Sequence, residues 1–336
     1  MIDKVYAKQK MNLLKIRDFS QAFSDTFKFI KLNGKSLFLS VLIYGGIFSL
    51  ILGVAYGLFM SKYFDLIGNV SGGDPFDESS IETIAYYGAV ILVAMVVGVL
   101  AFTVITGLNY KAVIEYEKMG ADEELTMNTI WRSTKKDFAR ILGGMFLLTF
   151  FLTISITIVV GVFALMAGGL ATINEGLMVI PMLMAFLMIF VGVAYLGTCL
   201  SPFWMVYLRE RLGFFDSIKR CFQLIKGNFW STFLVLFVMQ LLTSIASYIF
   251  QIPVLIYMMI KMVMGFDDNM TDPGDMLNFN EFIMGLLYAF SFFGRYLMLS
   301  IVLVATSIIY YNLVERNEGE DISKRIDNMG VDLSKY

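Results

Sequence analysis

The chain contains no histidine, and its 336 residues include only two cysteines, Cys199 and Cys221. Without an imidazole, a Ser-His-Asp triad, a Cys-His pair and every histidine-ligated metal site are excluded. Two cysteines also cannot supply the ligand set of a zinc or iron–sulfur centre. We therefore expect no metal and no cofactor, and we interpret both cysteines as free thiols that fill apolar space.

Charged side chains are scarce as well. They make up 16% of the residues, whereas 58% are hydrophobic; a soluble domain carries about a quarter charged residues. The net charge of −2 gives no basic excess, so a nucleic-acid partner is not expected. Residues 1–36 contain no short apolar segment with a small-residue cleavage site, so the first apolar stretch is expected to remain in the mature protein.

What the chain has in abundance is long apolar sequence, in six stretches that can each cross about 30 Å of hydrocarbon. The stretches are 37–60, 83–110, 141–167, 178–204, 230–265 and 282–314. They predict an all-α integral membrane protein with six transmembrane helices. Because Pro253 lacks a backbone donor, we divide the fifth stretch into a span at 230–250 and a peripheral helix at 253–264. By analogy, the sixth becomes a peripheral helix at 281–294 and a span at 296–314.

Basic residues alternate with acidic ones between the stretches. Of the 26 lysines and arginines, 23 lie in residues 1–36, 111–140, 205–229 and after 314. The intervening loops are acidic, with Asp74 and Glu78 in the first and Asp268 and Asp272 in the last. The positive-inside rule then predicts cytoplasmic termini in a bacterial cytoplasmic membrane. All three tryptophans fall at the cytoplasmic interface that this orientation predicts.

The basic flanks resemble one another. At an offset of 195 residues, Phe27, Lys31 and Asn33 of the first flank align with Phe222, Lys226 and Asn228 of the segment before the fifth stretch. Apolar residues fall on one helical face in both segments. A weaker copy precedes the third stretch. We predict three parallel hairpin repeats over 17–110, 124–204 and 214–314, each preceded by an amphipathic in-plane helix, in one membrane domain with a tail at 315–336. Similar flanks can also arise without duplication, since every cytoplasmic entry needs them.

One segment carries a family resemblance. The stretch SIKRCFQLIKGNFWSTFLVLF, the amphipathic flanks and the tail EGEDISKRIDNMG resemble bacterial multi-span proteins with a glycerophosphoryl diester phosphodiesterase membrane domain. The resemblance implies the membrane fold. In that family the phosphodiesterase chemistry belongs to a separate soluble barrel that uses histidines and acidic metal ligands. This chain has no such barrel, so the resemblance does not imply the enzyme.

Arg295 is the only clear charge inside an apolar stretch. A buried or intramembrane arginine can contact a substrate or lipid phosphate, or form an ion pair. The alternative is that its stem snorkels to the interface, since it lies about 24 Å along its helix from the cytoplasmic end. We favour snorkelling.

For the other unusual residues inside or beside the stretches we expect structural roles rather than functional ones. Gln240 can hydrogen-bond a neighbouring helix, and the pair Gly53 and Gly57 suits close helix contact. Gly192 begins a second copy of the Gly-Val-Ala-Tyr sequence found at Gly53. The acidic loop 266–281 could hold calcium, but its spacing does not match a calcium-binding hand.

The basic flanks are the second candidate surface. Such helices lie at the headgroup level and attract anionic lipid. One interpretation is that the basic flanks only anchor the chain at the membrane surface. The alternative is that they form a collar that binds lipid headgroups or a protein partner on the cytoplasmic face. The candidate contact residues are Arg295, Lys28, Lys31, Lys219, Arg220 and Lys226.

The sequence therefore predicts a non-catalytic membrane protein, a scaffold, accessory subunit or lipid-organising protein. No catalytic residue can be nominated. A transporter or permease for a lipid or small amphiphile is the alternative, and a polar cavity between the spans would favour it. An enzyme would need acidic and hydroxyl residues converging at one depth, and no such set is evident.

Overall fold

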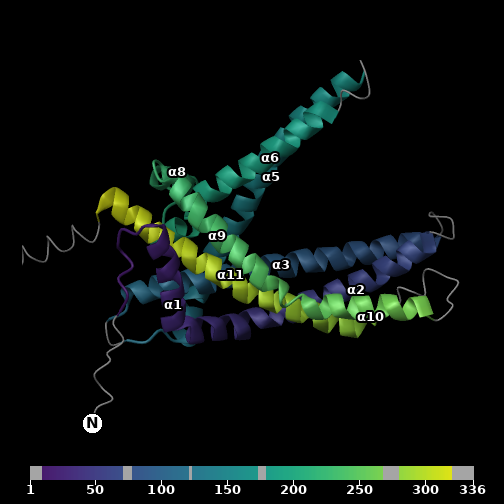
Figure 1. Ribbon diagram of the computed structural model, residues 1–336, viewed down its shortest axis with the longest axis horizontal. Coiled ribbons are helices and arrows are strands. Elements are labelled where there is room, and N and C mark those ends of the chain that lie inside the picture. The colour runs from purple at the N-terminus through teal and green to yellow at the C-terminus, as the bar shows by residue number, and fades with distance from the viewer. Residues whose placement is uncertain (1–9, 71–77, 121–122, 173–178, 268–279, 320–336) are drawn as a thin grey trace, which may run out of the picture. The chain divides into compact units, whose positions relative to one another are not determined.

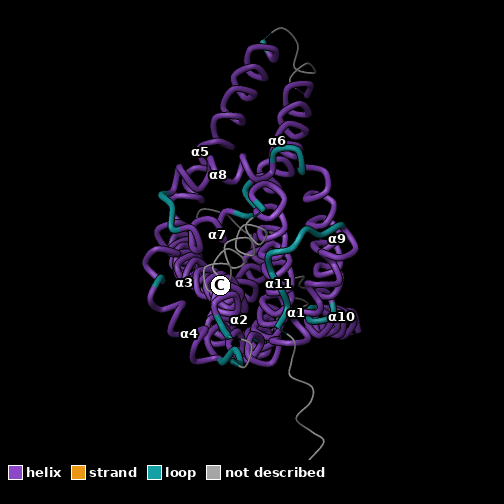
Figure 2. The backbone as a smooth tube through the Cα atoms, turned by 90° about the vertical axis from the view of Figure 1, so that its left-hand side faces the viewer, coloured by secondary structure: helices purple, strands orange, loops and turns teal. Residues whose placement is uncertain are grey.

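The computed structural model describes residues 10–70, 78–120, 123–172, 179–267 and 280–319. Within these ranges the chain is helical and contains no strand (Figure 2). Six helical segments are long and apolar enough to cross a membrane: Phe19–Met60, Gly88–Lys118, Phe138–Ala171, Val179–Glu210, Phe229–Tyr248 and Glu281–Glu318. The predicted all-α class with six membrane-length helices is confirmed.

The chain divides into two compact units, which are described separately. Unit 1 takes Thr26–Phe138 and Val238–Val304. Unit 2 takes residues 10–25, Ala139–Phe237 and, of the described chain, 305–319. The predicted repeat boundaries and the cytoplasmic tail stay predictions, and residues 320–336 of that tail lie outside the described residues.

Unit 1 is built mainly from long helices (Figure 1). Its elements are α1 (Phe19–Ser40) from Thr26 onward, the π-helical η1 (Val41–Gly45), α2 (Gly46–Val70), α3 (Glu78–Lys118), α4 (Met127–Lys136), the end of α9 (Phe229–Tyr248), α10 (Ile252–Asp267) and the first part of α11 (Glu281–Glu318). No loop separates α1, η1 and α2, so the first flank continues directly into its span. The flanks before the third and fifth stretches instead fold as separate short helices, α4 and α8.

Small residues let α2 and α11 approach closely in unit 1. A Cβ added at Gly53 would overlap the backbone of Ala289, and one at Gly57 would overlap the backbone of Gly285. These four residues form two facing small-xxx-small pairs, which bring helices together where lipid gives no hydrophobic drive. The predicted close contact at Gly53 and Gly57 is confirmed.

The fifth apolar stretch breaks where proline predicts it. Helix α9 ends at Tyr248, a turn of i→i+3 backbone bonds follows, and α10 begins at Ile252. Pro253 then lies in the first turn of α10, where its missing N–H costs no helical hydrogen bond. The corresponding division of the sixth stretch was wrong, because α11 runs unbroken through residues 281–318. That stretch contains no proline, and its first part packs on α2.

Polar side chains connect α4 to α3 through an ion pair and a hydrogen bond. Lys111 and Asp137 form an ion pair whose side chains are 2% and 8% exposed, and Ser133 donates a 2.9 Å hydrogen bond to Glu115. Asp137 ends α4, so the pair holds the short helix at its C-terminus. A buried charge is tolerated when it is paired in this way.

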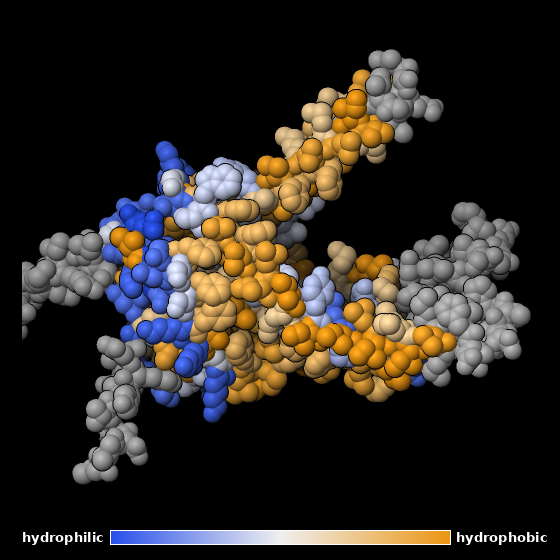
Figure 3. Space-filling view, viewed as in Figure 1, coloured by the Kyte–Doolittle hydropathy of each residue, from blue (hydrophilic) through white to orange (hydrophobic). Residues whose placement is uncertain are grey.

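Unit 2 contains two spans that have few neighbours. Its elements are α5 (Phe138–Ala171) from Ala139 onward, α6 (Val179–Cys199), the short α7 (Phe203–Met205), the π-helical η3 (Val206–Glu210), α8 (Phe214–Ile225), the start of α9 and the end of α11. The most apolar 18-residue window of α5 contains no buried residue. Figure 3 shows α5 and α6 apolar along their length, while hydrophilic residues gather around α8 and the C-terminal end of α11.

Candidate functional site

Unit 1 contains a polar-lined cavity between helices that are otherwise apolar. Its volume is about 490 Å³. The lining comes from α3, the end of α9, the turn after α9, and α11. The residues are Phe102, Gln240, Thr243, Ser244, Ser247, Tyr248, Gln251, Arg295, Tyr296, Leu299 and Val302. None of them is acidic.

The α9 side supplies one polar wall. Gln240, Ser244 and Ser247 lie three to four residues apart, as do Gln240, Thr243 and Ser247, which keeps these four on one helical face, and Gln251 follows in the turn after α9. The Gln240 amide donates to the Ser244 hydroxyl over 3.3 Å. Thr243 and Ser247 donate to backbone carbonyls of α9 itself, over 2.9 Å and 2.7 Å. In this contact the Ser244 hydroxyl accepts, so its own proton can be donated to a ligand in the cavity.

The α11 side supplies the charge and an apolar wall. Arg295 is exposed to the cavity, and among the described residues no hydrogen bond or ion pair reaches its guanidinium. Leu299 and Val302 lie one and two turns further along and are apolar. Gly294 meets the Phe250 ring so closely that a Cβ there would overlap it. This contact keeps the turn between α9 and α10 beside Arg295.

The cavity therefore combines one fixed positive charge with neutral hydrogen-bond donors. An arginine presents five donors and stays ionised. Within hydrocarbon an ionised side chain is costly unless it meets an opposite charge, a polar group or water. The lining has no carboxylate, histidine or cysteine that could act as base or nucleophile. The arrangement can hold an anion; it lacks the groups for acid–base chemistry.

The predicted contact residues are not gathered at this cavity. Arg295 lines it, whereas Lys28 and Lys31 lie exposed on α1 of unit 1. In unit 2, Lys219 on α8 and Lys226 after it are exposed. The predicted collar joins residues of both units and stays a prediction.

Arg220 differs from the other predicted contacts because acids already bind it. Its Nε donates to Glu210 over 3.1 Å, and it forms an ion pair with Glu318. Burial acts to lower the pKa of Arg220, but the contacts with Glu318 and Glu210 outweigh it and raise the pKa. Its charge is neutralised within unit 2, so Arg220 is a poor candidate for lipid contact.

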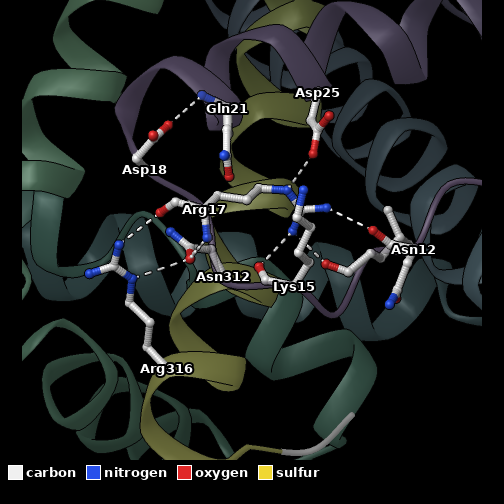
Figure 4. A network of polar contacts seen from close by, with 9 residues as sticks. Asn12, Lys15, Arg17, Asp18, Gln21, Asp25, Asn312 and Arg316 are labelled. Carbon is white, nitrogen blue, oxygen red and sulfur yellow. Dashed lines mark hydrogen bonds and ion pairs between the residues drawn. The ribbon is translucent and has the colours of Figure 1, made fainter. Parts of the chain in front are cut away.

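Unit 2 is held by a second polar network around Arg17 (Figure 4). The Arg17 side chain is fully buried and donates to the carbonyls of Leu13, Lys15 and Asn12 and to the carboxylate of Asp25. Its backbone N–H donates to Asn312 of α11 over 2.8 Å, and Arg316 donates to its carbonyl over 2.8 Å. All these partners belong to unit 2, so the network stabilises the unit and offers no binding group.

The same unit contains a cluster on η3 and α11. Tyr310 donates to Glu210 over 2.7 Å, and Arg209 donates to the Tyr310 hydroxyl over 3.0 Å. Cys221 lies buried on α8. Burial raises the pKa of the Cys221 thiol well above its usual range, and the charge of Glu210 raises it further. The interpretation of this cysteine as an unreactive filling residue agrees with its burial.

The glycine of the second Gly-Val-Ala-Tyr sequence has no neighbouring helix against it. A Cβ at Gly192 would have no neighbour within 4 Å, unlike one at Gly53. Sequence identity of the motif therefore does not decide whether a helix packs there.

Most of the polar wall was not predicted from the sequence. Gln240 was interpreted as an isolated polar residue, although Thr243, Ser244, Ser247 and Gln251 line the same cavity. The recurrence of polar residues three to four positions after Gln240 is the signal that predicts a polar stripe along the span. Residues 268–279 of the suggested calcium loop 266–281 lie outside the described residues, as does Asp74.

Comparisons with known proteins add no identification. No protein-family model matches the chain, and neither a curated protein nor a solved structure matches it significantly.

Proposed function

We propose that this chain is a non-catalytic multi-pass membrane protein that binds a membrane amphiphile in the unit 1 cavity. The observation that carries the proposal is the polar-lined cavity at Arg295 between apolar helices. Ligand sites characteristically combine apolar walls with a few convergent polar groups. A protein with such a site organises lipid around itself or acts as an accessory subunit for a lipid-handling partner.

A binding role suits the lining better than a catalytic role. Hydrolysis or group transfer needs a base, a nucleophile or a metal beside the substrate. The lining offers hydroxyls and amides without a base to activate them. We therefore propose that the cavity binds its ligand without changing it chemically.

Photo-crosslinking in nanodiscs tests the proposal. The probe is a phospholipid with a diazirine near its glycerol, and adducts are mapped by peptide mass spectrometry. We expect adducts on the cavity faces of α9 and α11, competed by unlabelled lipid. Ser244→Trp and Leu299→Trp fill the cavity from opposite walls and should each remove these adducts. Leu165→Trp on α5 is the matched control, because Leu165 is 80% exposed. Adducts spread evenly over all spans and unchanged by both filling variants would refute the proposal.

A lipid or amphiphile permease is the second candidate. The turn between α9 and α10 lies at the cavity, since Tyr248 and Gln251 both line it. Interrupted helices beside a binding site are common in transporters. A proteoliposome assay with fluorescent phospholipid separates the candidates: a permease accelerates exchange between leaflets and loses this activity on Ser244→Trp, whereas a binding protein leaves exchange at the protein-free rate.

The finer features of the membrane arrangement remain part of the proposal. We propose that the chain is a bacterial cytoplasmic-membrane protein with both termini in the cytoplasm. We also propose that it is related to the phosphodiesterase membrane-domain proteins. In this arrangement α4 and α8 lie in the membrane plane as parts of a repeated unit. The positive-inside distribution supports the orientation. The buried face of α8, formed by Ser217, Cys221, Leu224 and Ile225, supports an amphipathic helix. Cysteines introduced at Lys219 and at Lys62 should react with an impermeant maleimide from opposite sides.

A further inference from the structure

We propose that the unit 1 cavity selects an amphiphile with an anionic phosphate headgroup, which Arg295 binds through its guanidinium. The inference rests on the proposed lipid-binding function and adds the chemical class of the ligand. Arg295 is the only ionised residue of the lining, and no lining residue is acidic, so the lining carries one net positive charge. An occupied cavity is therefore electrically balanced only by a ligand of negative charge.

The arrangement of donors favours phosphate. A guanidinium fork matches two oxygens of a phosphate or carboxylate in one plane. Tyr248 ends α9 and Gln251 lies in the turn that follows, and both add neutral donors at the same end of the cavity. The ammonium group of a zwitterionic headgroup would find no counter-charge in the lining. An anionic headgroup is thus preferred over a zwitterionic one.

The position of Arg295 along α11 suits a lipid headgroup. Sixteen residues separate it from Tyr311, which at 1.5 Å per residue is about 24 Å. The polar side chains of Asn312 and Arg316 mark the end of the apolar run beyond Tyr311. About 24 Å from that end, Arg295 lies near the far boundary of a hydrocarbon layer roughly 30 Å thick. Lipid phosphates of the far leaflet lie at this level, within reach of a snorkelling arginine.

The remainder of the cavity suits an acyl chain. Leu299 and Val302 follow Arg295 along α11, and Phe102 contributes from α3. These side chains extend the lining from the charged end for about 10 Å along the helix. A ligand that fills both parts carries an anionic group and a hydrocarbon chain. Free inorganic phosphate would leave the apolar part without a partner.

Binding of defined ligands to the purified full chain tests the inference. Native mass spectrometry in neutral detergent would compare phosphatidylglycerol, phosphatidylcholine, a fatty acid and inorganic phosphate. We expect phosphatidylglycerol to bind about tenfold more tightly than phosphatidylcholine, as one charge-assisted contact implies. Arg295→Gln should abolish this preference: it should weaken phosphatidylglycerol binding about tenfold more than phosphatidylcholine binding, whose phosphate also loses its contact. Arg295→Lys should keep part of the preference, since it retains charge without the planar fork.

The matched control is the double variant Lys28→Gln with Lys31→Gln, which removes exposed basic residues of the same unit. It should keep the full preference. If it loses the preference while Arg295→Gln retains it, surface attraction explains the selectivity and the inference is overturned. Equally tight binding of inorganic phosphate, or tighter binding of the fatty acid, also overturns it in favour of a free anion or a carboxylate. Binding of all lipids that Ser244→Trp leaves unchanged would instead refute the underlying proposal of a lipid site in this cavity.

Discussion

Two helices with the same short sequence behave differently in the two units. Gly53 begins a Gly-Val-Ala-Tyr sequence in α2, and its backbone lies against Ala289 of α11. Gly192 begins the same sequence in α6, and a Cβ added there would meet open space. Tyr56 of the first copy contacts the ring of Tyr288, with centroids 4.5 Å apart. A small-residue motif permits close helix packing, but the partner helix must supply small residues at matching positions.

The two units are also stabilised by different kinds of contact. Unit 1 relies on close approach of apolar helices at Gly53 and Gly57 and on one buried ion pair. Unit 2 contains the exposed α5 and α6, a buried aromatic cluster around Phe203, and the polar networks of Arg17 and Glu210. Substitutions of single residues should therefore damage the two units in different ways.

The largest effect is expected at Arg17. Arg17→Leu removes the buried charge and strands Asp25 and several backbone carbonyls, which should lower the free energy of unfolding by about 3–5 kcal/mol. Lys15→Leu is the control, because the Lys15 side chain is exposed and only its carbonyl takes part in the network. Thermal unfolding in detergent measures both. Equal stability of the two variants would show that the network does not stabilise unit 2.

The next effect concerns the two glycine motifs. Gly53→Leu forces α2 away from α11 and should cost about 1–3 kcal/mol or more, as overpacking does. Gly192→Leu adds a side chain where there is open space, and should change stability by less than about 0.5 kcal/mol. The same unfolding assay compares them. A large loss from Gly192→Leu would mean that α6 packs on a partner, and the contrast between the units would then disappear.

A smaller effect is expected at Tyr310. Tyr310→Phe removes the hydroxyl that donates to Glu210 and should cost about 1 kcal/mol. Arg220 still donates to the Glu210 carboxylate, so that charge keeps a partner. Tyr248→Phe, at an exposed position, is the comparison variant and should leave stability unchanged. A loss well above 2 kcal/mol at Tyr310 would indicate a cooperative network.

The smallest expected effect is at Cys221. Because its thiol is buried and its pKa is raised, it should stay protonated and react very slowly with a maleimide at pH 8. The labelling rate should increase only at a pH well above the usual pKa range of a thiol. In a Cys199→Ala background, Gln223→Cys on the exposed side of α8 provides the reactive reference. Comparable labelling rates would show that α8 opens readily.

Local chemistry made much of the fold predictable. Hydropathy predicted the membrane-length helices, and Pro253 predicted the interruption that separates α9 from α10. The division of α11 failed because it rested on analogy with the fifth stretch: residues 281–294 contain no proline, and they pack against α2. For the site, Arg295 was recognised as unusual and its snorkelling stays a prediction, whereas the polar stripe on the facing helix was not predicted.

The sequence by itself determined the all-α class, the number of membrane-length apolar helices and the lack of imidazole ligands. These follow from length, hydropathy and the absence of histidine, which depend on no contact between helices. Only the tertiary structure decided that Arg295 faces Gln240, Ser244 and Gln251 across one cavity, and that Gly53 packs while Gly192 does not. The physical reason is that lipid solvates every apolar face equally, so helix pairing depends on shape and on buried polar contacts that one segment cannot specify alone.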